Sequence, residues 1–427
     1  MVFTWRFPAA LALGVVPVIL APTPATVAVW TLLVVVLAIC DVAGAVPPKA
    51  FRLARTVAKT PPGDASTPAT PTLTSADEPN RGVTAIRLTE LAWSVVAVTN
   101  PTRRPARLAL RDAWTASAGG ENEVRRLRVP GGATRRSGGL LRPRRRGEFG
   151  ADRVTVRSFG PLGMAGRQHS RDVPARLRVL PEFRSRNLLG PRLARLRELD
   201  GRPAQVRGQG TEFDSLRDYA LGDDVRSIDW RASARAEHVM VRTWRPERSR
   251  QVVIVLDTSR WAAGRVGDMT RLDAGIEAAL LLGAVAGAAG DRVQLLAADR
   301  ALRAWTAPVV GTGTLTALAN ALAMVKPALV EANWKLIAAQ LHARVRGRAL
   351  VVLLTSTDPA LVEVGLAPVA DGLMRRHAVM VGTIRDPADA ARLGARANLD
   401  ELYQAAAAAR RELAVAATEA RLRALGA

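Results

Sequence analysis

Carboxylate and hydroxyl side chains follow two apolar stretches in the C-terminal half of the sequence. The run QVVIVL leads into Asp-Thr-Ser, the run ALVVLL leads into Thr-Ser-Thr-Asp, and a Gly-Thr-Gly-Thr segment lies between them. Carboxylate and hydroxyl oxygens, completed by water, suit a hard cation such as Mg²⁺. A strand-end aspartate can instead cap backbone amides. The sequence therefore predicts a hard-cation site where these carboxylates and hydroxyls gather.

A parallel sheet is the element that would bring these side chains together. Strands are predicted over 251–256, 292–296, 349–354 and 378–384. Helices are predicted over 271–289, 314–324, 333–343, 359–375 and 399–425. Fully apolar strands that alternate with helices indicate an α/β fold whose sheet is covered on both faces. Such doubly wound sheets bind ligands beyond the carboxyl ends of their strands.

The first of these strands, with the residues directly after it, resembles a von Willebrand factor A domain. That family binds metal through Asp-x-Ser-x-Ser, a Thr from a later loop and an Asp after the fourth strand. Asp257 and Ser259 match the first two positions, but Trp261 stands at the third, and an indole ring cannot ligate a metal. The later Thr would be Thr314 or Thr312, and the distant carboxylate would be Asp358. The ligand set that the resemblance implies is therefore Asp257, Ser259, Thr314 and Asp358. The resemblance implies a degenerate Mg²⁺ site whose open position takes a partner's carboxylate.

The segment before this domain carries a second resemblance. Residues 208–235 (GQGTEFDSLRDYALGDDVRSIDWRASAR) closely resemble the signature of the domain of unknown function 58 family. Residues 146–163 and 290–293 resemble further stretches of that family. In that family the signature leads into an A-type domain, as it does here.

Charged residues alternate around aromatic ones in the signature. This pattern predicts either a rigid collar that docks on the A-type sheet or a partner-binding surface, since Arg and Trp are common interface anchors. The adjacent carboxylates Asp223 and Asp224 would permit acid–base chemistry, although Gly-Asp-Asp favours a turn. The candidate residues are Phe213, Arg217, Tyr219, Gly222, Asp223, Arg226, Asp229, Trp230 and Arg235.

The N-terminus is read as a transmembrane helical hairpin over residues 1–46. Two apolar runs, 7–21 and 25–46, flank Pro22-Thr23-Pro24, and each approaches the roughly 20 residues that a bilayer requires. A cleaved signal peptide is the alternative, but the basic region before the first run is Arg6 alone. Basic residues at both outer ends predict cytoplasmic soluble domains. These residues are Arg6, Lys49, Arg52, Arg55 and Lys59.

The soluble part divides by composition into four segments. Residues 47–82 hold a linker rich in Pro, Thr and Ser, and residues 83–182 show short strands separated by Gly-Gly turns, typical of a small β-sandwich-like domain. Residues 183–250 form the signature connector, and residues 251–427 form the von Willebrand factor A-like domain. A dense arginine patch at 135–146 is either a solvated loop or a surface for anionic lipid heads.

Composition excludes several classes of function. The formal charge is +23, but only four basic residues are Lys. Such a bias toward Arg, with abundant Ala, is typical of a GC-rich genome. The arginine patch at 135–146 has no interleaved aromatic residues, and the chain shows no recognised nucleic-acid motif. One cysteine, Cys40, excludes a disulfide framework. No Gly-x-Ser-x-Gly, Walker or His-Glu-x-x-His motif is present.

The sequence therefore predicts a membrane-anchored, non-enzymatic adaptor or scaffold. The family resemblance implies a MoxR-type AAA+ ATPase, or its client, as the protein partner. No small-molecule substrate and no nucleic acid is expected. Two other classes stay open: a structural envelope protein that binds lipid or itself, and an envelope hydrolase, for which the catalytic motifs are missing.

Overall fold

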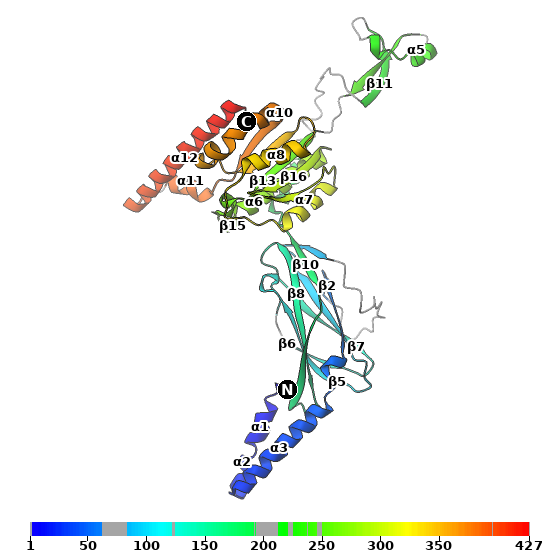
Figure 1. Ribbon diagram of the computed structural model, residues 1–427, viewed down its shortest axis with the longest axis vertical. Helices are drawn as coiled ribbons and strands as arrows, with labels where there is room; N and C mark the ends of the chain where they lie inside the picture. Colours follow the sequence, from blue (N-terminus) through cyan, green and yellow to red (C-terminus); the bar gives the residue numbers. More distant parts are fainter. Residues whose placement is uncertain are drawn as a thin grey trace. The chain divides into compact units, whose positions relative to one another are not determined.

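The computed structural model describes residues 2–61, 83–121, 124–191, 193, 212–220, 225–236, 238–245, 250–394 and 396–426. The chain divides into two compact units, Met1–Glu182 and Phe183–Ala427 (Figure 1). The first unit contains the N-terminal helices and a β domain. The second contains an α/β sheet and the signature segment. Most of the predicted linker, residues 62–82, lies outside the described residues.

One helix of the described residues is long and apolar enough to cross a membrane, and this is α3, Pro24–Gly44. It begins where the Thr23 hydroxyl accepts a hydrogen bond from the Thr26 amide. The first apolar run instead forms two short helices, α1 (Arg6–Ala12) and α2 (Val15–Leu20).

The break between α1 and α2 is fixed by a contact with α3. The Trp30 indole donates to the Ala10 carbonyl at 3.1 Å, which satisfies an acceptor in an apolar setting where an unpaired one is costly. A Cβ at Gly14 would lie 2.3 Å from the Trp30 ring. Glycine is therefore required for the two arms to approach each other.

The base of the helical pair is joined to the β domain by a buried carboxylate. Asp41, near the end of α3, is 2% exposed. Its two oxygens accept from the backbone amides of Leu162, Met164 and Ala165 at 2.7, 2.7 and 3.0 Å. At the other arm, β1 (Val2–Phe3) pairs antiparallel with β9 (Ala165–Asp172). Both arms therefore end in the same β8–β9 turn region.

The β domain packs two sheets on a common core. One sheet has the order β2 (Arg52–Ala58), β4 (Ala92–Thr99), β7 (Thr134–Leu141). The other is built on β5 (Ala106–Trp114), β6 (Val124–Val129), β8 (Gly147–Phe159), β9, β10 (Arg176–Leu180) and β3 (Thr84–Arg87). Apolar residues of β4 pack against those of β5 and β8. This is the sandwich-like arrangement that the strand spacing predicted.

The boundary predicted for the linker is wrong, because β2 lies inside the range 47–82 and is a full strand of the sandwich. The arginines of β2 made this segment resemble a polar linker in the sequence. Arg55 is 3% exposed and pairs with Asp112 at 2.5 Å, and it also donates to the carbonyls of Asp152 and Val173. Arg55 is thus a core residue of the β domain, and it does not belong among the basic residues used to assign orientation.

The second unit contains a five-stranded sheet with the order β17-β16-β13-β18-β19. The strands are β13 (Gln251–Asp257), β16 (Arg292–Ala298), β17 (Leu302–Trp305), β18 (Leu350–Thr355) and β19 (Ala378–Thr383). All neighbours pair in parallel except β16 and β17. The chain leaves the central strand β13 toward one edge and later returns to its other side at β18, which creates a topological switch point.

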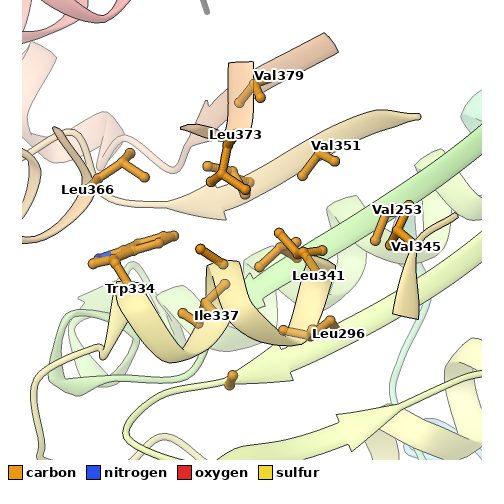
Figure 2. Packing of buried hydrophobic residues seen from close by; sticks show 14 of the residues in the cluster. Val253, Leu296, Trp334, Ile337, Leu341, Val345, Val351, Leu366, Leu373 and Val379 are labelled. Carbon is orange, nitrogen blue, oxygen red and sulfur yellow. The ribbon is translucent and has the colours of Figure 1, made fainter. Parts of the chain in front are cut away.

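Helices cover both faces of this sheet. On one face, α6 (Arg271–Ala288) and α7 (Gly313–Ala323) pack on β13 and β16. On the other, α8 (Trp334–Arg344) and α10 (Ala367–Arg376) enclose a second apolar cluster, in which Trp334, Ile337 and Leu341 face the strands (Figure 2). The chain ends with α11 (Pro387–Gly394) and the long α12 (Leu399–Leu425), which pack on each other.

We expect Asp41→Ala to destabilise the first unit by about 3 kcal/mol, because three backbone amides, two of them buried, would each lose a charged acceptor. Thermal unfolding of the detergent-solubilised protein measures the effect, and hydrogen exchange at residues 162–165 locates it. Asp172→Ala, at an exposed carboxylate of β9, is the matched control and should change neither. Equal behaviour of the two variants would contradict the role of Asp41.

The second unit should lose stability in mild acid through His377. This ring is 2% exposed, neither ring nitrogen has a hydrogen-bond partner in the described structure, and it stacks on His342. Burial first, then the charges of Arg376 and His342, lower the pKa of His377. As the pH falls, His377 of the unfolded chain therefore binds a proton near pH 6.5, whereas His377 of the folded chain stays neutral at that pH. The melting temperature should fall as the pH drops below about 6.5, and His377→Phe should reduce that fall.

Candidate functional site

The site lies beyond the carboxyl ends of β13 and β18, where Asp257 is 3% exposed. Its carboxylate accepts from the Thr355 hydroxyl at 2.6 Å and from the Ser259 amide at 2.8 Å. Burial raises the pKa of Asp257, although these hydrogen bonds oppose that shift. Asp257 therefore ties the end of the central strand to the end of its neighbour.

A second buried carboxylate lies one strand away. Asp299, directly after β16, accepts from the Thr258 hydroxyl at 2.7 Å, from the Arg303 guanidinium at 2.7 Å and from the Ala301 amide at 3.1 Å. Burial alone would raise the pKa of Asp299, but the bonds from Arg303, Thr258 and Ala301 outweigh it and hold that pKa below its usual value.

The segment after α7 covers this side of the crevice. The Ala328 amide donates to the Thr258 carbonyl at 2.8 Å, and the Asn333 amide donates to the Asp299 carbonyl at 3.0 Å. The ends of β13 and β16 are thus bridged by backbone, and the open part of the crevice lies toward β18 and β19.

Thr314 lies at the opposite edge of the sheet, contrary to the predicted ligand set. Val309, shortly before it, pairs with Val293 at the start of β16, and a Cβ at Gly287 would lie 2.8 Å from the Thr314 hydroxyl. Gly287 is 16 residues beyond Arg271 on α6, or about 24 Å along the helix, whereas Arg271 lines the crevice with Asp257. Thr312, the alternative ligand, also lies at the opposite edge of the sheet, because it immediately precedes α7.

The remaining predicted ligands do not complete a magnesium site. Asp358 accepts from the Ala360 amide at 3.0 Å and caps a short helix. Ser259 is buried and lies near Asp257, but its hydroxyl forms no hydrogen bond of ordinary geometry in the described structure. Trp261 offers only an N–H donor where the family pattern places a hydroxyl. The described residues include no cluster of three or more His, Cys, Asp or Glu side chains that could hold a metal ion.

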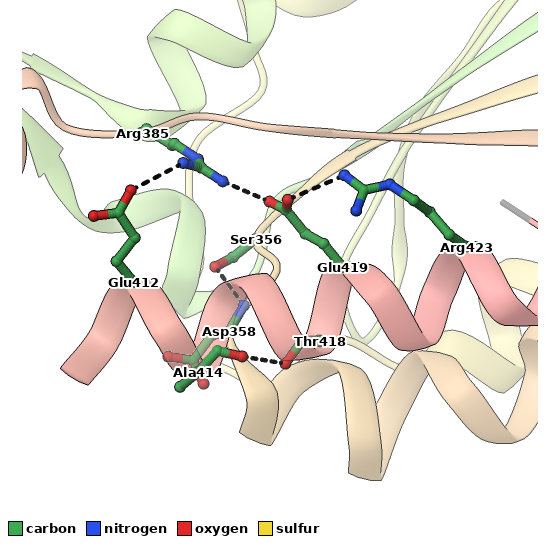
Figure 3. A network of polar contacts seen from close by, with 8 residues as sticks. All are labelled: Ser356, Asp358, Arg385, Glu412, Ala414, Thr418, Glu419 and Arg423. Carbon is green, nitrogen blue, oxygen red and sulfur yellow. Dashed lines mark hydrogen bonds and ion pairs between the residues drawn. The ribbon is translucent and has the colours of Figure 1, made fainter. Parts of the chain in front are cut away.

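A cavity of about 500 Å³ opens beside these residues. Its walls come from the ends of β18 and β19, from Trp261 and Arg271, and from the α11–α12 helix pair. Arg385, which lines the cavity, lies between Glu412 and Glu419 of α12, at 3.8 and 2.8 Å (Figure 3). This volume falls within the range of small-ligand sites.

The signature segment forms a compact hairpin of its own. Strands β11 (Glu212–Asp218) and β12 (Met240–Arg245) pair antiparallel, with Phe213 opposite Trp244 and Arg217 opposite Val241. Tyr219 continues the pairing through its amide to the Val239 carbonyl.

Asp229 organises the helix of this segment, α5 (Trp230–Ala236). Its carboxylate accepts from the Ala232 and Arg231 amides and pairs with Arg242 at 2.7 Å. The amide bond from Ala232 and then the Arg242 hydrogen bond lower the pKa of Asp229.

The other described signature residues lie in or shortly before α5. Trp230 is 68% exposed. Arg235 lies in the last turn of α5, and Arg226 in a short 3₁₀ turn at Val225–Ser227. Gly222, Asp223 and Asp224 lie outside the described residues, so the acid–base hypothesis for this pair stays a prediction.

Two residues of the crevice were missed from the sequence. Asp299 follows an apolar strand in the same way as Asp257, so the same strand-end rule would have found it. Arg271 is harder to find, because it is the first residue of α6 behind a Thr270–Asp273 capping box and reads as an ordinary helix start.

One part of the chain matches a known protein family. Residues 215–421 match the family described as "Protein of unknown function DUF58". This match runs from β11 to α12 and excludes the predicted stretch at 146–163. No curated protein matches the chain.

Two solved structures share local similarity. "X-ray structure of Northeast Structural Genomics Consortium target SoR45" is 12% identical with a TM-score of 0.17, covering 30% of this chain and 87% of its own. "ASH / PapD-like domain of human CEP192 (PapD-like domain 7)" is 12% identical with a TM-score of 0.16, covering 28% and 96%. Scores this low support no argument about fold or function.

We expect Asp257→Asn to melt at a higher temperature than the parent at pH 7. In the unfolded chain the Asp257 carboxyl loses its proton near pH 3.9, whereas burial raises its pKa in the folded chain. Ionisation of this buried group therefore lowers the free energy of unfolding as the pH rises through the folded-state pKa. The amide keeps both partners, with its oxygen accepting from Ser259 and its NH₂ donating to the Thr355 hydroxyl.

The gain should shrink as the pH is lowered toward 4, which paired thermal melts of the two proteins would measure. Asp257→Ala is the contrasting variant. It leaves two buried donors without an acceptor and should lose about 1–3 kcal/mol. A neutral-pH melting temperature for Asp257→Asn as low as that of Asp257→Ala would contradict this interpretation.

Proposed function

We propose that the protein is a membrane-anchored, non-enzymatic adaptor whose C-terminal unit binds protein partners, foremost a MoxR-type AAA+ ATPase or its client. The proposal rests on the hydrogen bonding of the two buried carboxylates in the crevice. Asp257 and Asp299 are buried and occupied by internal hydrogen bonds, which favours a structural role over acid–base work. The cavity beside them leaves a surface for binding.

The strand order supports an A-type domain. A central strand that ends in Asp-Thr-Ser, three parallel neighbours and one antiparallel edge strand fit the von Willebrand factor A resemblance. The metal site of that family is not part of the proposal, because Thr314 and Trp261 do not fit it. Partner binding would use the same edge of the sheet without the ion.

The exposed surface of α3 supports membrane anchorage. Val29, Leu32 and Ile39 are 67%, 64% and 57% exposed, and a contiguous apolar surface of this kind is unfavourable in water. Arg6, Lys49, Arg52 and Lys59 flank the two arms, which supports a cytoplasmic location for both units. The first arm, α1 with α2, would insert beside α3 as the other half of the hairpin.

Affinity capture of the tagged full-length protein from its own membranes, followed by mass spectrometry, tests the adaptor. We expect an AAA+ ATPase among the recovered proteins, with recovery reduced several-fold in the double variant Arg385→Gln/Leu393→Glu. These changes remove a charge from the exposed edge of the cavity and place one on its apolar wall, and they leave the buried carboxylates in place. Asp371→Asn, at an exposed Asp371–Arg375 pair on α10, is the matched control and should leave recovery unchanged. Absence of any ATPase would overturn the adaptor, and equal recovery from all variants would exclude the crevice as the docking surface.

A further inference from the structure

We propose that the end of the β domain next to α3 binds the headgroups of anionic phospholipids through a basic belt. The inference rests on the membrane anchorage proposed above and adds to it a binding site and a ligand class. It concerns the first unit alone. The belt consists of six exposed residues, Lys49, Arg52, Arg103, Arg104, Arg107 and Arg128.

Chain order and strand register bring the belt to one end of the sandwich. Lys49 and Arg52 follow shortly after the end of α3. Arg107 lies opposite Phe159, the last residue of β8, and the turn after β8 binds the end of α3. Arg128 lies opposite Arg107 on β6. The belt therefore surrounds the point at which α3 joins the β domain.

The loop that carries Arg103 and Arg104 is fixed by a buried amide. Asn100 is 0% exposed, and its side-chain nitrogen donates to the carbonyls of Arg104 and Val129 at 2.8 and 3.3 Å. Its oxygen accepts from the amide and the hydroxyl of Thr102. The loop is thus held in one conformation, so that little conformational entropy is lost when it binds a ligand.

No acidic side chain on the surface of this end offsets the belt. The four segments that form the end contain no Asp or Glu, and they are residues 45–52, 99–107, 128–136 and 157–168. Asp41 lies nearby, but it is buried and accepts from three backbone amides. Arg107 and Arg128 lie directly opposite each other, and like charges in that position are destabilising. An external anion would relieve this repulsion.

The β8–β9 turn adds an exposed apolar side chain beside these charges. Leu162 is 47% exposed. The Arg6 guanidinium donates to the Leu162 carbonyl at 2.8 Å, and the Arg107 guanidinium donates to the Pro161 carbonyl at 3.2 Å. A leucine flanked by guanidinium groups suits the boundary between acyl chains and headgroups.

The length of α3 places this end at the level of the headgroups. The helix has 21 residues, which corresponds to about 31 Å and matches the roughly 30 Å hydrocarbon core of a bilayer. When α3 spans the membrane, the belt around its end meets the lipid phosphates. An acidic protein segment would have to displace lipid to reach the same residues, so an anionic lipid surface is the favoured occupant.

The arginine patch predicted at 135–146 supplies a control within the same unit. Arg142, Arg144 and Arg145 are exposed and lie in the turn between β7 and β8. The belt lies at the other end of β8, a strand of 13 residues, or roughly 40 Å away. This separation is several times the Debye length of roughly 8–10 Å at physiological salt. The three arginines match three belt arginines in charge but lie too far from the headgroups to bind them.

The test titrates the full-length protein, in a neutral detergent, with dioctanoyl phosphatidylglycerol or dioctanoyl phosphatidylcholine, and native mass spectrometry counts the bound lipids. A basic residue near an anionic lipid surface contributes about fivefold to binding. We therefore expect phosphatidylglycerol to bind about tenfold or more tightly than phosphatidylcholine. The preference should shrink in about 0.5 M salt, because screening weakens exposed charges.

Charge removal from the belt should abolish the preference. The triple variant Arg104→Gln/Arg107→Gln/Arg128→Gln should bind phosphatidylglycerol about tenfold or more weakly and phosphatidylcholine as the parent does. The triple variant Arg104→Lys/Arg107→Lys/Arg128→Lys keeps the charge and should retain most of the preference. Thermal melts of each variant check that the β domain is folded, and the lysine variant keeps the test decisive if the glutamine variant is not.

The control variant Arg142→Gln/Arg144→Gln/Arg145→Gln should bind phosphatidylglycerol like the parent. Equal affinity of the parent for the two lipids, or equal loss of phosphatidylglycerol in the belt and control variants, would overturn the inference. Displacement of the lipid by hexaglutamate at an equal concentration of charge would show that the belt is a site for acidic peptides instead.

The anchorage and the belt fail in distinguishable ways. Alkaline carbonate washing of the protein's own membranes tests the anchorage, and release of the parent protein would contradict it. Retention of the parent and of both glutamine variants, with no lipid preference in the parent, would leave the anchorage standing and exclude the belt. Retention of all three with the preference lost in the belt variant alone would support both.

Discussion

Buried carboxylates impose the constraint on which both units depend. An ionised carboxylate removed from water is unfavourable unless donors surround it, and the chain meets this requirement at Asp41, Asp257 and Asp299 with backbone amides, hydroxyls and one guanidinium. Each of these residues lies in or just beyond a regular element, so satisfying it fixes where a second element must lie. Asp41 fixes α3 against the β8–β9 turn, and Asp257 fixes β13 against β18.

This constraint also limits what the crevice can do chemically. A carboxylate whose lone pairs are committed to internal donors is poorly placed to act as a base or a metal ligand. Arg271 and Trp261 line the cavity beside the crevice, together with an apolar wall from α11 and α12. The crevice lies at the switch point of the sheet, where doubly wound folds bind their ligands.

The N-terminal unit obeys the same constraint in a different environment. Its helices expose apolar side chains along their length but end in polar contacts with the β domain, through Asp41, Thr4 and Arg6. Strand β1 adds backbone pairing to β9. The two helical arms are therefore attached to the β domain at separate points.

The sequence alone determined the features that local pattern controls. Continuous apolar runs predicted the parallel strands and α3, because a strand buried on both faces and a membrane helix each need uninterrupted hydrophobicity. Turn spacing predicted the sandwich, and strand-end polarity predicted Asp257. Strand β2 was missed because buried Arg55 resembles a surface charge until Asp112 is placed beside it. Only the tertiary structure could separate Thr314 from Asp257, since the antiparallel strand β17 returns the chain to the amino edge before α7. Likewise, only tertiary structure placed Arg271 beside Asp257, because proximity between distant residues depends on three-dimensional contacts that residue types and spacing do not encode.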